Sequence, residues 1–225
     1  MDLYRIADLN LTIHTNSLTI AENIRRYKVD YQETPNVTLG ITDDRMIELM
    51  EEYEGYTADV VETVAISTQF CWELFDYNGF PIRATAVEHD GRCILFASPF
   101  NESFDPRIVL PENMVFTYNY PAIRLEGDVY YAFDTPFGIN GKYAKPGHKF
   151  PLESIVFIDA QRFDSLRKLD SKDFVPMFMR AVAQNVRQER TKHSLFILGN
   201  LMHKVNFFGI RDVSPYDIDF ILERV

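Results

Sequence analysis

The stretch that decides the fold is Asp90–Asp105, DGRCILFASPFNESFD. Its first half is a DG turn at Asp90-Gly91 followed by the apolar run Cys93–Ala97, which predicts a hairpin strand. Such a strand can lead into a phosphate-binding loop, where several glycines, a lysine and a Ser or Thr precede a helix. The second half, Ser98–Asp105, has no glycine and no lysine. The sequence therefore predicts the position of a phosphate-binding loop without the residues that the loop needs.

Upstream of this stretch we expect short strands and two helices. The predicted strands are Leu9–Ile13, Val37–Ile41 and Phe80–Glu88, with Ala21–Tyr31 read as strand or loop. Thr42-Asp43-Asp44 offers an N-cap for a helix over Arg45–Tyr53, and a second helix is predicted from Thr57 to Phe75. Three- and four-residue spacings predict the face of the second helix that docks on a sheet, namely Val60, Val61, Val64, Ala65, Thr68, Cys71, Trp72 and Phe75.

Downstream, strands and helices are mixed rather than strictly alternating. The predicted strands are Met114–Tyr118, Ala122–Leu125, Val129–Phe133, Ile155–Ile158 and Val205–Ile210. The predicted helices are Ser171–Glu189, His193–Lys204 and one that ends at Leu222. This order predicts an α/β fold with a mixed β-sheet core and flanking helices. Residues 1–78 are expected to pack as strands and helices on a core formed by residues 79–225, in one compact unit.

Composition limits the classes of function. The net charge of −10 argues against general nucleic-acid binding, which needs a basic face. Apolar runs stay near five residues, as at Cys93–Ala97, against the ~20 that span a bilayer, so no membrane association is expected. The acidic N-terminus predicts no signal peptide, and Cys71 and Cys93 are expected to be buried free thiols in the cytoplasm. Neither the cysteines nor the histidines have a metal-ligand spacing, so no metal and no cofactor is predicted.

One family shares the order of these pieces. The pieces are Ile82–Val87, the DG turn, Ile94–Phe96, the loop position, Val115–Asn119, Pro121–Arg124, Thr135–Gly138 and Pro151-Leu152 leading into Ile155–Ile158. Together they resemble the C-terminal domain of HPr serine kinase/phosphorylase and its kinase-like relatives, which share a phosphate-loop core with phosphoenolpyruvate carboxykinase. The resemblance covers roughly residues 80–225 and implies a bacterial, cytoplasmic protein with that core.

The residues that perform the family's chemistry are replaced in this chain. Arg83 stands where the family has a histidine, and Phe104 stands at the position of the phosphate-loop lysine. Tyr118 and Asn119 replace a pair of acids, and tyrosine ionises only near pH 10. Pro106 and Pro111 bracket the segment that would form the helix after the loop. The resemblance therefore implies a degenerate member of the family, a pseudoenzyme without catalytic residues.

A basic loop provides the remaining candidate site. The candidate ligand-binding residues are Arg124, Thr135, Lys142, Lys145, His148 and Lys149, and in the resembled family this loop lies close to the phosphate site. Three functions stay open. The first is an inactive HPr kinase-like interaction or regulatory subunit, which binds an unknown protein partner or associates with itself. The second is a binding module for a small anionic or phosphorylated ligand. The third is a residual kinase whose rearranged site uses Lys142, Lys145 and His148.

Overall fold

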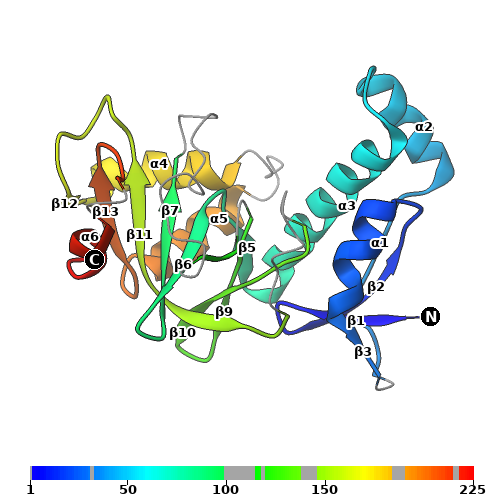
Figure 1. The fold of residues 1–225 in the computed structure, drawn as a ribbon, viewed down its shortest axis with the longest axis horizontal. Helices are drawn as coiled ribbons and strands as arrows, with labels where there is room; N and C mark the ends of the chain where they lie inside the picture. The colour runs from blue at the N-terminus through cyan, green and yellow to red at the C-terminus, as the bar shows by residue number, and fades with distance from the viewer. Residues whose placement is uncertain are drawn as a thin grey trace.

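The computed structural model describes residues 2–30, 33–98, 115–117, 120–137, 146–183, 191–214 and 218–225. It is a mixed α/β structure with two mixed sheets (Figure 1). The N-terminal sheet and helices α1, α2 and α3 lie at one end of the molecule, and a larger sheet with α4, α5 and α6 lies at the other.

The N-terminal sheet has the strand order β3-β1-β2-β4. Its strands are β1 (Leu3–Ile6), β2 (Leu9–His14), β3 (Lys28–Val29) and β4 (Val37–Gly40). The β1–β2 turn places Ala7 and Asp8 at φ of 51° and 55°, a left-handed conformation that residues other than glycine seldom adopt. The predicted strands Leu9–Ile13 and Val37–Ile41 are confirmed.

The prediction for Ala21–Tyr31 was wrong, because most of this segment is helical. It contains most of α1 (Leu18–Ile24) and the 3-10 turn η1 (Arg25–Tyr27). The Ser17 side chain caps α1 by accepting a hydrogen bond from the Ile20 amide. Ile20 and Ile24, one turn apart, are both buried in the N-terminal core, so a short amphipathic helix explains the segment.

The next two helices begin where the sequence predicts. Thr42 caps α2 (Asp43–Glu52) and Thr57 caps α3 (Ala58–Leu74), which the 3-10 turn η2 (Phe75–Tyr77) follows. The predicted docking face of α3 was only partly right. Val61 and Cys71 are buried, but Val60 and Val64 are exposed, and the side chains that enter the N-terminal core are Ile66, Phe70 and Leu74. Because α3 is apolar around much of its circumference, spacing alone did not identify the packed face.

The larger sheet joins an antiparallel part to a parallel part. The order β5-β9-β10-β11-β7-β6-β8 is extended by β13 beside β11 and by β12 beside β13. Its strands are β5 (Gly79–Pro81), β6 (Thr85–His89), β7 (Arg92–Ala97), β8 (Val115–Thr117), β9 (Ala122–Glu126), β10 (Val129–Phe133), β11 (Lys149–Ile158), β12 (Arg167–Lys168) and β13 (Asn206–Ile210). The predicted strand Phe80–Glu88 is in fact β5 and β6, which pair with β9 and β7 respectively.

The predicted hairpin at Asp90-Gly91 is confirmed, with both residues at positive φ as a two-residue turn requires. β7 and β11 run parallel and are buried on both faces. Leu95 and Phe157 face α4 (Ser171–Ala183) and α5 (Thr191–Leu201), whereas Phe96 and Val156 face α6 (Ile218–Leu222). Such burial explains why these strands are continuous apolar runs in the sequence.

Candidate functional site

The carboxyl ends of the parallel strands define one edge of the larger sheet. β11 pairs in parallel with both β7 and β13, with Phe157 opposite Ala97 and Gly209. β6 is antiparallel to both β7 and β8, so β8 ends at the same edge as β7. In sheets of this kind, ligands bind beyond the carboxyl ends of the strands. This edge is therefore the first candidate site.

The described polar residues at this edge mostly hold the backbone in place. The Arg83 amide donates to the Ala181 carbonyl of α4 at 3.2 Å, which ties the segment before β6 to that helix. Asp159, directly after β11, accepts from the Gln161 amide at 2.9 Å and pairs with Arg162 at 3.3 Å. Ser98 is buried, and its hydroxyl has no hydrogen-bond partner within the described ranges. Phe104, Tyr118 and Asn119, the other replaced family positions, lie outside the described residues.

Arg124 and Lys149, two of the predicted ligand-binding residues, bind the β1–β2 turn. The Lys149 ammonium donates to Asp8 Oδ2 at 2.7 Å and to Glu126 Oε2 at 2.6 Å. Arg124 donates to the Ala7 carbonyl and, through Nε, to the Tyr77 carbonyl at 3.2 Å. We call this group the turn clamp: Arg124, Glu126 and Lys149 of the larger sheet with the turn residues Ala7 and Asp8.

The electrostatic interactions of the turn clamp favour the charged forms of Asp8 and Lys149. Burial opposes the ionisation of Asp8, but the hydrogen bonds and charges of Lys149 and Arg5 outweigh it, so the pKa of Asp8 is lowered. Burial likewise opposes the charge on Lys149, yet Asp8 and Glu126 raise its pKa. Burial lowers the pKa of Arg124, partly offset by Glu126 and Asp8. An anionic ligand would have to compete with these carboxylates.

The turn clamp also lies far from the carboxyl edge. Lys149 is the first residue of β11 and Ile158 the last. At ~3.3 Å per residue, roughly 30 Å of strand separates Lys149 from the end of β11. Thr135 is buried and donates its hydroxyl to the Tyr120 carbonyl at 3.1 Å. Lys142 and Lys145 lie outside the described residues, and the role of the set in ligand binding stays a prediction.

His148 does line a cavity, of about 230 Å³, beside the turn clamp. The N-terminal unit contributes cations to this cavity, which the sequence analysis did not consider; the charged lining residues are Arg5, Asp8, Arg26, Lys28 and Asp134. The Tyr27 hydroxyl donates to Asp134 Oδ2 at 3.0 Å. Burial raises the pKa of Tyr27 far above its ordinary value, and the negative charge of Asp134 contributes to the same shift. The basic run Arg25-Arg26-Tyr27-Lys28 in an acidic chain was the available signal.

The prediction that both cysteines, Cys71 and Cys93, are free and buried is confirmed. Burial raises the pKa of Cys71 to about 12 and that of Cys93 well above its ordinary value, so neither thiol is a reactive nucleophile.

In the described part of the chain, no three His, Cys, Asp or Glu side chains gather as metal ligands would, and no helix is long and apolar enough to cross a bilayer.

No protein-family model matches the chain, and no curated protein matches it.

Proposed function

We propose that this chain is a catalytically inactive HPr kinase-like protein that acts in the cytoplasm as an interaction or regulatory subunit. One observation carries the proposal. β7 ends beside β11 at the carboxyl edge of the parallel strands, where a phosphate-binding loop would begin, and the following segment Ser98–Asp105 has neither glycine nor lysine. Without glycines, successive N–H groups are not easily aimed at one phosphate. Without the lysine, a transferring phosphoryl group would lose an important neutralising charge.

Arg124 on β9 and Lys149 at the start of β11 do not supply a substitute. Lys149 binds Asp8 and Glu126, and Arg124 binds two backbone carbonyls, at the opposite end of β11 from the carboxyl edge. A kinase site rebuilt on these side chains would have to break the turn clamp. The turn clamp therefore argues against a kinase site built on Arg124 or Lys149, whereas Lys142 and Lys145, on which the residual kinase depends, lie outside the described residues.

A second candidate function is the binding of a small anion, and the His148 cavity is the observation that favours it. Arg5, Arg26 and Lys28 outnumber Asp8 and Asp134 in its lining. Its volume of about 230 Å³ suits inorganic phosphate or a small phosphorylated group rather than a whole nucleotide. Because Arg5 pairs with Asp8, a ligand would have to compete with that ion pair.

Thermal unfolding with ATP, GTP, pyrophosphate and inorganic phosphate, each with and without Mg²⁺, tests both candidates. A ligand at a hundred times its Kd adds about 2.7 kcal/mol of stability, which such a measurement detects. We expect no Mg²⁺-dependent stabilisation by nucleotide, and such stabilisation would overturn the inactive-subunit proposal. Stabilisation by phosphate alone supports the second candidate if Arg26→Met and His148→Ala remove it. Lys192→Met, at an exposed position on α5, is the matched control.

A further inference from the structure

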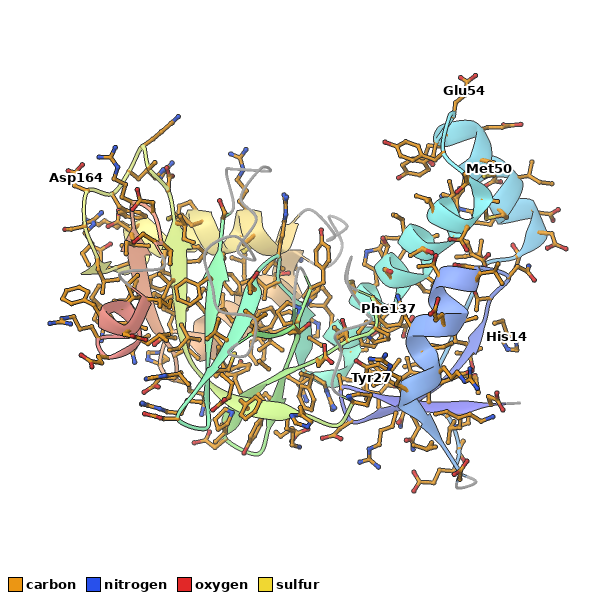
Figure 2. The ribbon with its side chains drawn as sticks, in the orientation of Figure 1. His14, Tyr27, Met50, Glu54, Phe137 and Asp164 are labelled. Atoms are coloured by element: carbon orange, nitrogen blue, oxygen red, sulfur yellow. The ribbon has the colours of Figure 1, made fainter. Side chains whose placement is uncertain are left out.

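The helices α2 and α3 enclose a groove of about 840 Å³ that the sequence analysis did not predict. Figure 2 shows this helical pair, which carries Met50 and Glu54, extending away from the larger sheet. One wall of the groove is the outward face of α3, with Val60, Val64 and Trp72, and the other includes Leu49 of α2 and the following Tyr53. The groove is therefore lined by aliphatic and aromatic side chains from both helices.

Several apolar and aromatic side chains that line this groove are exposed to solvent. Val60 is 42% exposed, Val64 is 50% exposed and Tyr56 is 61% exposed. Leu49 is the one buried residue of α2, so this helix buries little apolar surface of its own. A contiguous exposed apolar surface of this kind is typical of a site that binds another protein.

The two helices that form the groove, and the turn between them, are strongly acidic. Asp43–Leu74 carries nine acidic side chains and a single basic one, against a net charge of −10 for the whole chain. The acids are Asp43, Asp44, Glu48, Glu51, Glu52, Glu54, Asp59, Glu62 and Glu73. Two of them do not face the groove, because Asp59 accepts hydrogen bonds from Ser17 and Thr19 and the buried Glu62 accepts one from the Asn16 amide. Glu52 and Glu73 line the groove together with the one base, Arg45, which already pairs with Glu48 at 2.6 Å. This surface repels nucleic acids and anionic membranes and attracts cationic partners.

We propose that the α2–α3 groove binds a basic amphipathic helix of a partner protein. Apolar side chains at i, i+3, i+4 and i+7 of that helix would enter the groove, and flanking lysines or arginines would face the acidic rim. α3 has 17 residues. At 1.5 Å per residue this is roughly 25 Å, which accommodates about four turns of a partner helix. The inference rests on the proposed function in one respect, that the chain acts through a protein partner, and it does not depend on the loss of catalysis.

Trp72 provides a direct test, because it lines the groove and is the single tryptophan of the chain. The probe is a synthetic amphipathic helix of about 18 residues made of leucine and lysine, titrated into the full chain at low salt. We expect a saturable change in Trp72 fluorescence that weakens as salt is added. The same peptide with glutamate in place of lysine serves as the charge control and should not bind.

Two double variants separate the apolar contribution from the electrostatic one. Val60→Ser with Val64→Ser removes exposed apolar contacts without changing charge, and Glu52→Gln with Glu73→Gln removes two negative charges from the lining. Each should weaken binding at least tenfold. Leu195→Ser with Phe196→Ser is the matched control, since both residues are exposed on α5 outside the groove lining. Circular dichroism checks that every variant keeps the fold.

Four results would overturn the proposal. The first is that the lysine peptide does not bind, and the second is that the glutamate peptide binds equally well. The third is that both groove variants bind the lysine peptide as tightly as wild type does. The fourth is that the protein self-associates and that Val60→Ser with Val64→Ser abolishes this self-association. The last would identify a second copy of the chain as the occupant. Nucleotide-dependent stabilisation would instead count against the proposed function alone, so the two failures are distinguishable.

Discussion

At the scale of single residues, the turn clamp shows basic side chains with a structural task. The turn residues Ala7 and Asp8 both have positive φ, which costs about 1–2 kcal/mol per residue outside glycine. Arg124 binds the carbonyl of one and Lys149 the carboxylate of the other. Tertiary contacts therefore hold a turn conformation that local preference disfavours.

Lys149→Met should lower the free energy of unfolding by about 1 kcal/mol, as expected for a partly exposed ion-pair network. Because the pKa of Asp8 is depressed in the folded protein, this contribution is present above the ordinary aspartate pKa and is lost as pH falls through the lower folded value. The difference between wild type and variant should thus be largest at pH 5–7 and shrink below pH ~4. Urea titrations across this pH range measure it.

Lys28→Met is the control for this prediction. Lys28 pairs with Asp2 at 2.8 Å, with both side chains about half exposed, and exposed pairs contribute little. A Lys28→Met variant as destabilised as Lys149→Met would show that the turn clamp has no special role.

At the scale of the elements, local signals predicted strands and helices better than they predicted packing. Thr42 and Thr57 cap their helices as expected, and the Asp90-Gly91 turn forms its hairpin. The helix α1 has only 7 residues and its N-cap, Ser17, precedes Ala21–Tyr31, so that segment by itself lacks the signal that starts the helix. The predicted packed face of α3 was only partly right because two apolar faces satisfy the same periodicity.

The different packing around Gly209 on β13 and Gly199 on α5 leads to opposite predictions for their substitution by alanine. A Cβ at Gly209 would lie 2.4–2.6 Å from the ring of the buried Phe163, whereas a Cβ at Gly199 on α5 meets nothing within 4 Å. Gly209→Ala should therefore destabilise the protein by about 1–3 kcal/mol through overpacking. Gly199→Ala should stabilise it by up to about 1 kcal/mol, because alanine is the better helix former. The urea midpoints of unfolding of the two variants test this prediction. Midpoints that both rise or both fall relative to wild type would contradict it.

At the scale of the whole molecule, one apolar core links the two sheets. The ring centroids of Phe70 on α3 and Phe137, which is labelled in Figure 2, are 4.7 Å apart. Ala122 and Phe133 of the larger sheet belong to the same buried cluster as Ile66 and Leu74 of α3. The turn clamp adds polar contacts between the same parts. From this continuity we predict that residues 1–78 and 79–225 unfold as one cooperative unit.

Urea unfolding followed by two probes tests that cooperativity. Trp72 fluorescence reports on α3, and far-UV circular dichroism reports on all helices and strands. We expect coincident transitions, since the shared core does not let one part unfold alone. An earlier fluorescence transition would show that residues 1–78 unfold separately.

The sequence by itself determined the mixed α/β class, the hairpin, the buried thiols and the absence of glycine and lysine from Ser98–Asp105. These features follow from local dihedral preferences and composition, which act over a few residues. Only the tertiary structure decided that Lys149 binds Asp8, 141 positions away, and that α3 leaves Val60 and Val64 exposed. Such contacts depend on which elements pack together in space. Residue spacing does not determine which of two apolar helix faces is buried, or which of several acids a lysine pairs with.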